Sequence, residues 1–156
     1  MMAYEYRSTI GQDSHRFVDR LNRAATAEEL ARPLLLGGFV IPSATGLAGN
    51  SDADVILHAL TNAVSGLTGV NILGKISDQM CLEQGITDSR AYLERALQDL
   101  GDWQITQLSF TIEGKRPHLS AWIDSMRESI APLVGIEPHD VGITATTGEG
   151  LTDFGL

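Results

Sequence analysis

One aspartate and two histidines in this sequence have the chemistry of a divalent metal site. Asp13 and His15 stand two positions apart in a segment that reads as extended, and side chains at that spacing project from the same face. Together with His58 they offer two nitrogens and one carboxylate oxygen, which suits Zn²⁺ and leaves a fourth position for water or substrate. The Asp-x-His pattern is common, however, and it also fits a polar strand end with a surface histidine.

The cysteine content bears on what kind of metal site this would be. The chain has a single cysteine, Cys81. A structural zinc normally closes its shell with four ligands that usually include cysteines, so a metal held here would occupy an open, functional site. One cysteine also excludes an internal disulfide and fits a reducing compartment.

His58 falls in the middle of a predicted amphipathic helix, residues 51–67. Apolar side chains recur at helical spacing and define one face of it, namely Ile56, Ala59, Leu60, Ala63, Val64 and Leu67. His58 falls on the opposite face with Asp54, Thr61 and Ser65. Ser51 and Asp54 resemble a capping box, which would fix the start of the helix. The pattern predicts a rigidly held histidine that points at something polar.

The other elements form a mixture of short strands and helices. Alternation of apolar and polar residues and a Gly-Gly turn predict strands at 4–10, 34–36, 39–41, 105–113 and 141–145. Capping residues predict further helices, which open after Thr26, at Thr87-Asp88-Ser89 and after Pro117. Residues 66–85 show no clear period and are expected to form a long irregular connection. Because strands and helices do not alternate strictly, the order favours an α+β fold over a doubly wound sheet.

Composition limits the class of protein. The 156 residues are expected to form a single domain, 1–156, and 43% hydrophobic content is ordinary for a globular protein. No apolar run approaches the ~20 residues of a transmembrane helix. The N-terminus resembles neither a signal nor a transit peptide, so we expect a cytoplasmic protein. The net charge of −9 argues against nucleic-acid and membrane partners, and an anionic substrate would need a metal to offset the repulsion.

Several segments resemble, in the right order, the motifs of the 2-C-methyl-D-erythritol 2,4-cyclodiphosphate synthase family. Residues 11–17 resemble the family's opening metal motif, and residues 50–55 with 58–61 resemble its metal-binding helix. Further matches are Leu36-Gly37-Gly38, Thr87-Asp88-Ser89-Arg90, and Ala145-Thr146-Thr147 with Glu149. Each match is weak alone, but as a set they are specific and cover roughly residues 5–156.

The resemblance implies both a fold and an activity. The fold would be α+β, with a single-layer mixed or antiparallel sheet and helices on one face, chorismate-mutase-like, in a homotrimer with active sites between subunits. The activity would be an intramolecular phosphoryl transfer in non-mevalonate isoprenoid precursor synthesis. The 2-phosphate of 4-diphosphocytidyl-2-C-methyl-D-erythritol 2-phosphate attacks the β-phosphate, closes a cyclic diphosphate and expels CMP. Positioning and charge neutralisation by metals supply most of the rate in such chemistry.

The same resemblance implies site residues. Zn²⁺ or another divalent cation would be held by Asp13, His15 and His58, and Glu149 would hold Mg²⁺ or Mn²⁺ on the substrate diphosphate. Thr147 would act with Glu149 in catalysis through a hydrogen bond to a phosphate, supported by Thr146. The remaining substrate contacts would come from Gly114, Leu119 and Ala145 around the cytidine, and from Ser51, Gly74 and Asp78 around the methylerythritol.

The chain departs from the family pattern mainly in the sugar site. Asn50 stands where the family has a histidine, Asn71 stands in the run that carries an acidic residue for the sugar hydroxyls, and Ser77-Asp78 replaces Phe-Pro-Asp. Elsewhere His118 replaces a lysine and Gly148 a threonine. The resemblance also implies a further turn and strand after Leu156, so either that strand is lost or the sequence is truncated.

Three functions remain open from the sequence. The chain could be the synthase with a modified sugar loop. It could be a diverged metal-dependent enzyme of the same fold, acting on another nucleotide-linked or phosphorylated small molecule, and Asn71 weakly favours this alternative. It could also be a non-catalytic trimeric protein that binds metal or nucleotide, which the intact metal set argues against.

Overall fold

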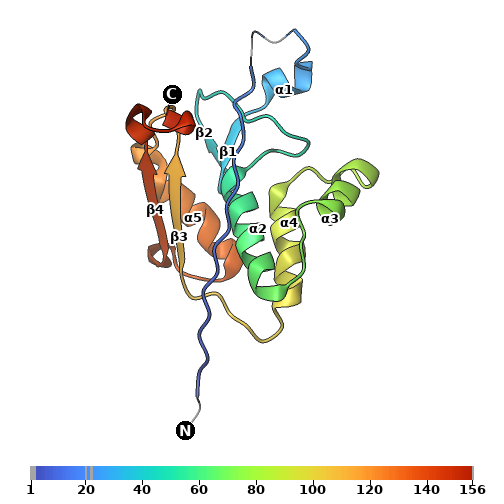
Figure 1. The fold of residues 1–156 in the computed structure, drawn as a ribbon, viewed down its shortest axis with the longest axis vertical. Helices are drawn as coiled ribbons and strands as arrows, with labels where there is room; N and C mark the ends of the chain where they lie inside the picture. Colours follow the sequence, from blue (N-terminus) through green and yellow to red (C-terminus); the bar gives the residue numbers. More distant parts are fainter. Residues whose placement is uncertain (1–2, 20, 22, 156) are drawn as a thin grey trace.

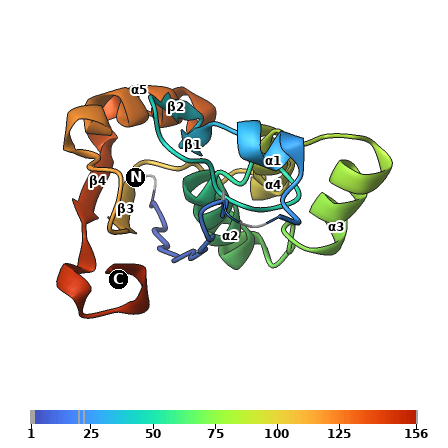
Figure 2. The same cartoon turned by 90° about the horizontal axis from the view of Figure 1, so that it is seen from above.

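A computed structural model describes residues 3–19, 21 and 23–155 of the chain. Its centre is a pair of packed helices, α2 (Val55–Thr68) and α4 (Ser89–Leu97), with α5 (Ile123–Val134) beside them (Figure 1). Strands β3 (Leu108–Glu113) and β4 (Val141–Thr146) lie at one end of the molecule. Seen from above, α3 (Lys75–Asp78) lies at the other end, beyond α2 and α4 (Figure 2).

The remaining elements are short. Helix α1 covers Ala27–Ala31, and the hairpin strands are β1 (Leu34–Leu36) and β2 (Phe39–Ile41). A π-helical turn, Gln79–Glu83, continues α3. Single 3₁₀ turns cover Gln98–Leu100, Ser120–Trp122, Pro138–Asp140, Gly148–Gly150 and Asp153–Gly155. The capping box predicted at Thr26 is confirmed, since its side chain accepts from the backbone of Glu29 and the Glu29 side chain accepts in return.

The α+β class is confirmed, but the strands of the described residues form two small sheets and not one layer. Strands β1 and β2 pair antiparallel through the predicted Gly37-Gly38 turn, where both glycines have positive φ. Strands β3 and β4 pair parallel, with Leu108 opposite Val141. Strand β3 begins at Leu108, later than the predicted residue 105, and β4 extends one residue beyond the predicted 145.

The predicted strand at residues 4–10 is wrong. This segment is extended but has no strand partner, and it runs alongside α2 as a single trace (Figure 1). Its contact with α2 includes a hydrogen bond from the Thr9 hydroxyl to the carbonyl of Ala63, 2.7 Å. Alternation of apolar and polar residues predicts an extended backbone, but a strand also requires a neighbour with which to form a ladder.

Helix α2 differs from its prediction in two respects. It begins at Val55, and its N-cap is Asp54, whose carboxylate accepts from the backbone of Leu57, so no capping box starts at Ser51. The predicted polar face is also buried: Asp54 and Thr61 are fully inaccessible to solvent, and His58 and Ser65 are nearly so. Helix α4 packs against α2, where Ser89 contacts His58, and the turn between β1 and β2 covers Asp54.

The prediction of an irregular connection at residues 66–85 is also wrong. Helix α2 continues to Thr68 and ends at Gly69 in the left-handed conformation, and α3 with its π-helical turn occupies most of the remaining residues. The other helix predictions are confirmed, since Asp88 caps α4 and α5 follows Pro117 after one 3₁₀ turn.

Candidate metal centre

The structure brings Asp13, His15 and His58 together. Oδ2 of Asp13 lies 2.8 Å from Nε2 of His15 and 3.1 Å from Nδ1 of His58. The two ring nitrogens are themselves 3.1 Å apart. One ligand atom from each residue lies within 4.8 Å of the others, which is the arrangement that a single divalent cation requires. We call these three residues the metal cluster.

The close approach of the N-terminal segment to α2 places Asp13 and His15 beside His58. Gly11 makes this approach, because a Cβ atom at this position would overlap the backbone of Ala59 and Ala63. The amide of Asn62 on α2 also donates to the carbonyl of Gln12, 3.1 Å away. A glycine therefore permits the contact that assembles the cluster from two distant parts of the sequence.

A second set of contacts orients the His15 ring. Its Nδ1 lies 3.0 Å from the carbonyl oxygen of Ala48, and because a carbonyl only accepts, Nδ1 carries the proton. In the neutral ring, Nε2 therefore directs its lone pair at the cluster. The segment that carries Ala48 is paired with the N-terminal segment, through an isolated bridge between Phe17 and Leu47 and a hydrogen bond from the nitrogen of Ala48 to the carbonyl of Arg16.

Electrostatics favour a cation at this position. Partial burial alone would raise the pKa of Asp13, but the contacts of its carboxylate with the rings of His15 and His58 outweigh the burial and hold the pKa well below its ordinary value. The hydrogen bond to Asp13 in turn raises the pKa of His15. A carboxylate that stays ionised beside two imidazole nitrogens fits a divalent cation such as Zn²⁺.

Two cavities meet at the metal cluster. The smaller, about 280 Å³, is lined by the whole cluster and by Asn50, Ser51, Asn62, Leu73, Ser77, Asp78, Cys81 and Tyr92. The larger, about 440 Å³, is lined by Asp13 and His15 and extends to β3 and β4. Asp13 and His15 line both cavities, so a ligand that spans the two would place its middle portion at the cluster.

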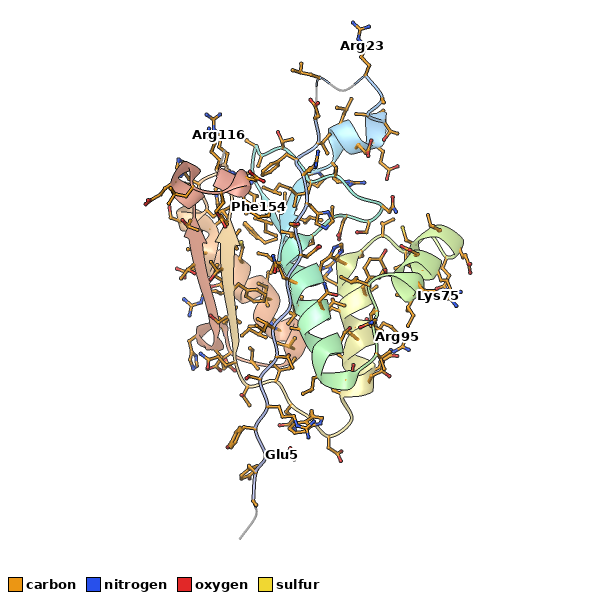
Figure 3. All side chains as sticks on the ribbon, in the orientation of Figure 1. Glu5, Arg23, Lys75, Arg95, Arg116 and Phe154 are labelled. Atoms are coloured by element: carbon orange, nitrogen blue, oxygen red, sulfur yellow. The ribbon has the colours of Figure 1, made fainter. Side chains whose placement is uncertain are left out.

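The two groups of predicted substrate residues separate between these cavities. Ser51 and Asp78 line the smaller one, whereas Gly74, the N-cap of α3, does not line it. The larger one is lined by Gly114, Leu119 and Ala145, predicted around the cytidine, and by Thr146 and Thr147, predicted at a phosphate. Arg116 and Phe154, which also line it, lie at the end of the β3–β4 pair where the C-terminal turns fold back (Figure 3).

Comparison with known proteins gives the family. The model of the YgbB family matches residues 6–156. This chain belongs to the YgbB family. A relative from Chlamydia abortus, named 2-C-methyl-D-erythritol 2,4-cyclodiphosphate synthase, is 44% identical over 151 residues, which cover 96% of this chain and 81% of the relative. A relative of the same name from Chlamydia trachomatis serovar L2b is also 44% identical, over 96% of this chain and 80% of its own length.

Solved structures agree with this family. A structure titled as 2C-methyl-D-erythritol-2,4-cyclodiphosphate synthase is similar with a TM-score of 0.72 and 29% identity, over 95% of this chain and 93% of that one. The bifunctional IspDF of Campylobacter jejuni is similar with a TM-score of 0.78 and 25% identity, over 95% of this chain and 38% of that one. In the described part of this YgbB chain, no helix is both long and apolar enough to span a membrane.

Glu149 lies apart from the metal cluster in this YgbB chain. It is exposed, with a φ of 51°, in the 3₁₀ turn that follows β4. Its backbone nitrogen donates to the hydroxyl of Thr147, 3.3 Å away. Among the described residues, the groups close enough to share an ion are Asp13, His15 and His58, and Glu149 is not one of them.

Sequence reasoning overlooked three residues that hold the metal cluster in place. Gly11 permits the approach to α2. Ser89 contacts the far side of the His58 ring, and Asp52 contacts Ser89. Ser89 belongs to the segment Thr87-Asp88-Ser89-Arg90, which resembles a family motif. From the sequence, this segment predicts only the start of a helix. Nothing in the spacing of these residues indicates that they meet.

Proposed function

We propose that this chain is a 2-C-methyl-D-erythritol 2,4-cyclodiphosphate synthase. An oxygen of the substrate's 2-phosphate attacks the β-phosphorus of the cytidine diphosphate group. The bond between that phosphorus and the oxygen of CMP breaks, and CMP leaves with the cyclic diphosphate as the other product. The observation that carries the proposal is the position of the metal cluster, which lies where two cavities meet.

The two cavities suit the two ends of this substrate. The smaller one is polar through Asn50, Ser51 and Asp78, and it would receive the methylerythritol hydroxyls. The larger one would receive the cytidine against Gly114, Leu119 and Ala145, with Thr147 donating to a phosphate oxygen and Thr146 beside it. The phosphates in the middle of the substrate would then lie at Asp13 and His15.

Residues of the chain would hold two kinds of divalent cation. The metal cluster fits Zn²⁺, and Glu149 would hold Mg²⁺ or Mn²⁺ together with the substrate diphosphate. Bound cations would supply charge neutralisation at the phosphate oxygens. This matters for a chain with a net charge of −9, which otherwise repels a phosphorylated substrate.

The other two functions considered from the sequence are not favoured. Relatives at 44% identity over almost the whole chain bear the synthase name, and the metal cluster is complete. Asn50 and Asp78 keep the smaller cavity polar, although the sugar loop departs from the family pattern.

Turnover of the cytidine-linked substrate tests the proposal. The purified chain is incubated with 4-diphosphocytidyl-2-C-methyl-D-erythritol 2-phosphate, Zn²⁺ and Mg²⁺, and the products are identified by mass spectrometry. We expect CMP and the cyclic diphosphate in equal amounts. The matched control is His139→Gln, which changes an exposed histidine outside both cavities and should keep full activity. Folded, zinc-loaded protein that binds the substrate and releases no CMP would refute the proposal.

We also propose a cytoplasmic homotrimer in which neighbouring subunits complete each site. Large apolar side chains are exposed along the N-terminal segment and the C-terminal turns, including Tyr6, Ile10 and Leu151, and an assembly would bury such surface. Light scattering gives the oligomeric state. Co-expression of His58→Ala with Thr147→Ala tests whether a neighbouring subunit's Thr147 serves the metal cluster, because about a quarter of the sites would be regained if the two residues of one site come from two subunits. No recovery would place each site within one chain.

A further inference from the structure

The far side of the His58 ring faces Ser89, a buried polar residue that the proposed reaction does not use, and Ser89 in turn contacts Asp52. Nε2 of His58 lies 2.9 Å from the hydroxyl of Ser89, and the ring itself is 8% exposed. Ser89 is fully buried at the start of α4, and its hydroxyl also contacts Oδ1 of Asp52. The hydroxyl of Ser51 is farther from Nε2, at 3.4 Å, and already accepts from the nitrogen of Ala53.

Backbone contacts hold the Asp52 carboxylate in place. Its Oδ2 accepts from the nitrogen of Ser89 at 2.9 Å, and its Oδ1 accepts from the nitrogen of Asp54 at 3.1 Å. The nitrogen of Asp52 donates to the carbonyl of Thr87, also at 2.9 Å. Asp52 therefore joins the start of α2 to the start of α4, and its position does not depend on His58.

The direction of the protons along this chain of contacts follows from the groups themselves. An ionised carboxylate only accepts, so the single hydroxyl proton of Ser89 goes to Asp52. The hydroxyl oxygen of Ser89 must then accept from His58, which requires a proton on Nε2. A neutral imidazole protonated at Nε2 carries its lone pair on Nδ1. Nδ1 is the nitrogen that lies 3.1 Å from Oδ2 of Asp13, inside the metal cluster, where a bound cation would take its lone pair.

We propose that Asp52 and Ser89 are positioning residues that hold His58 as its Nε2–H tautomer and direct the Nδ1 lone pair into the metal cluster. We call this arrangement the Asp52–Ser89–His58 relay. The relay rests on the proposed function, in which a metal binds at the cluster. It identifies contacts outside the cluster that would influence the affinity for that metal. Outer contacts of this kind raise the basicity of a histidine ligand and fix its orientation.

Zinc affinity of a serine variant tests the relay. Ser89→Ala removes the acceptor for Nε2–H and leaves both tautomers of His58 open. We expect it to lower zinc affinity about 10- to 100-fold, measured by competition with a chromophoric chelator on the folded protein. The matched control is Ser65→Ala, a buried serine of α2 whose hydroxyl accepts from the nitrogen of Ile72 and does not touch His58. This control should bind zinc as the unmodified chain does.

A conservative variant separates the hydroxyl from the packing. Ser89→Thr keeps a hydroxyl, so it should regain most of the zinc affinity lost in Ser89→Ala. The relay is wrong if folded Ser89→Ala binds zinc within about twofold of the unmodified chain, well inside the loss expected for an outer contact. It is also wrong if Ser89→Thr loses as much affinity as Ser89→Ala.

The tautomer can be read directly, without any change to Ser89. Long-range ¹H–¹⁵N spectra of ¹⁵N-histidine-labelled protein distinguish the two ring nitrogens, and His58→Gln identifies the signals. Without metal, Asp13 and His15 offer acceptors to Nδ1 of His58, while Ser89 offers one to Nε2. In the metal-free protein at about pH 9, where an ordinary imidazole is neutral, we expect His58 to be protonated at Nε2, because Asp52 fixes the Ser89 hydroxyl as an acceptor. Protonation at Nδ1 would overturn the relay even if zinc binds. Failure of the unmodified chain to bind zinc would instead refute the metal proposal and leave this spectrum to decide the tautomer.

Discussion

The carboxylate of Asp54, the N-cap of α2, accepts a hydrogen bond of 2.6 Å from the backbone nitrogen of Gly38 in the turn between β1 and β2. The same carboxylate accepts from the nitrogen of Gly37 at 2.9 Å and from that of Leu57 at 3.0 Å. Burial raises the pKa of Asp54, although these three donors act against the rise. A side chain that the sequence places on the polar face of a helix thus anchors the hairpin to the helix that carries His58.

Replacement of Asp54 should destabilise the fold more than the loss of an ordinary helix cap. Asp54→Ala leaves several backbone donors without an acceptor, and we expect a loss of roughly 3 to 5 kcal/mol in the free energy of unfolding. The control is Asp88→Ala, which removes the more exposed N-cap of α4 and should cost about 1 kcal/mol. Urea denaturation measures both variants, and equal losses would show that the hairpin contacts contribute nothing.

Removal of the His58 imidazole should abolish stoichiometric zinc. His58→Ala deletes one of three ligands, so we expect a loss of affinity greater than the 10- to 100-fold typical of outer contacts. Because His58 also lies between α2 and α4, some loss of stability is expected as well, and circular dichroism should confirm the fold. Elemental analysis measures the zinc, with His139→Ala as the exposed control. A His58→Ala protein that keeps one zinc per chain would contradict the ligand assignment.

A methyl group at Gly11 should weaken metal binding without touching any ligand. The added Cβ would overlap the backbone of Ala59 and Ala63, so Gly11→Ala should push the N-terminal segment away from α2 and separate Asp13 from His58. We expect a loss of zinc affinity of about 10-fold or more, comparable with loss of a contact that orients a ligand.

The control for this change lies on α2 itself. At Gly66 a Cβ would make only ordinary contacts, 3.7 Å from Thr9 at the nearest, so Gly66→Ala should leave zinc affinity unchanged. Equal affinities in the Gly11 and Gly66 variants would show that the close approach at Gly11 does not set the geometry of the cluster.

The stability of the metal-free protein should depend on pH through Asp13 and His15. The raised pKa of His15 means that its contribution is fully present below 6.5 and is lost as pH rises through the folded-state pKa. The lowered pKa of Asp13 means that its contribution is present above 3.8 and is lost as pH falls through the folded-state pKa. The pair should therefore stabilise the protein most between these two values.

Thermal unfolding in the presence of a chelator measures this effect. The difference in Tm between the unmodified chain and His15→Gln should be largest between pH 3.8 and 6.5 and should shrink on both sides. A difference that does not vary with pH would indicate that the two side chains are not paired in the metal-free protein.

Much of the local structure could be predicted because its signals lie within a few residues of one another. The Thr26 capping box, the Gly37-Gly38 turn and the cap within residues 87–89 each depend on contacts across a single turn. Each is observed, with Asp88 as the residue that caps α4. The prediction of a strand at residues 4–10 is wrong because a strand depends on contacts far away in the sequence. Pairing depends on a distant neighbour, and no periodicity in the segment itself can indicate whether one is present.

The amino-acid sequence alone determined the family, the α+β class and the identity of the groups that can bind a metal. These depend on which residue types occur and in what order, and both can be read without the structure. Tertiary structure decided which of those groups meet. The backbone of α2 lies against Gly11, which brings Asp13 to His58, and α4 packs against α2, which brings Ser89 to the other side of the same ring. Contacts between residues 30 or more positions apart depend on how helices pack, and packing is a property of the whole chain.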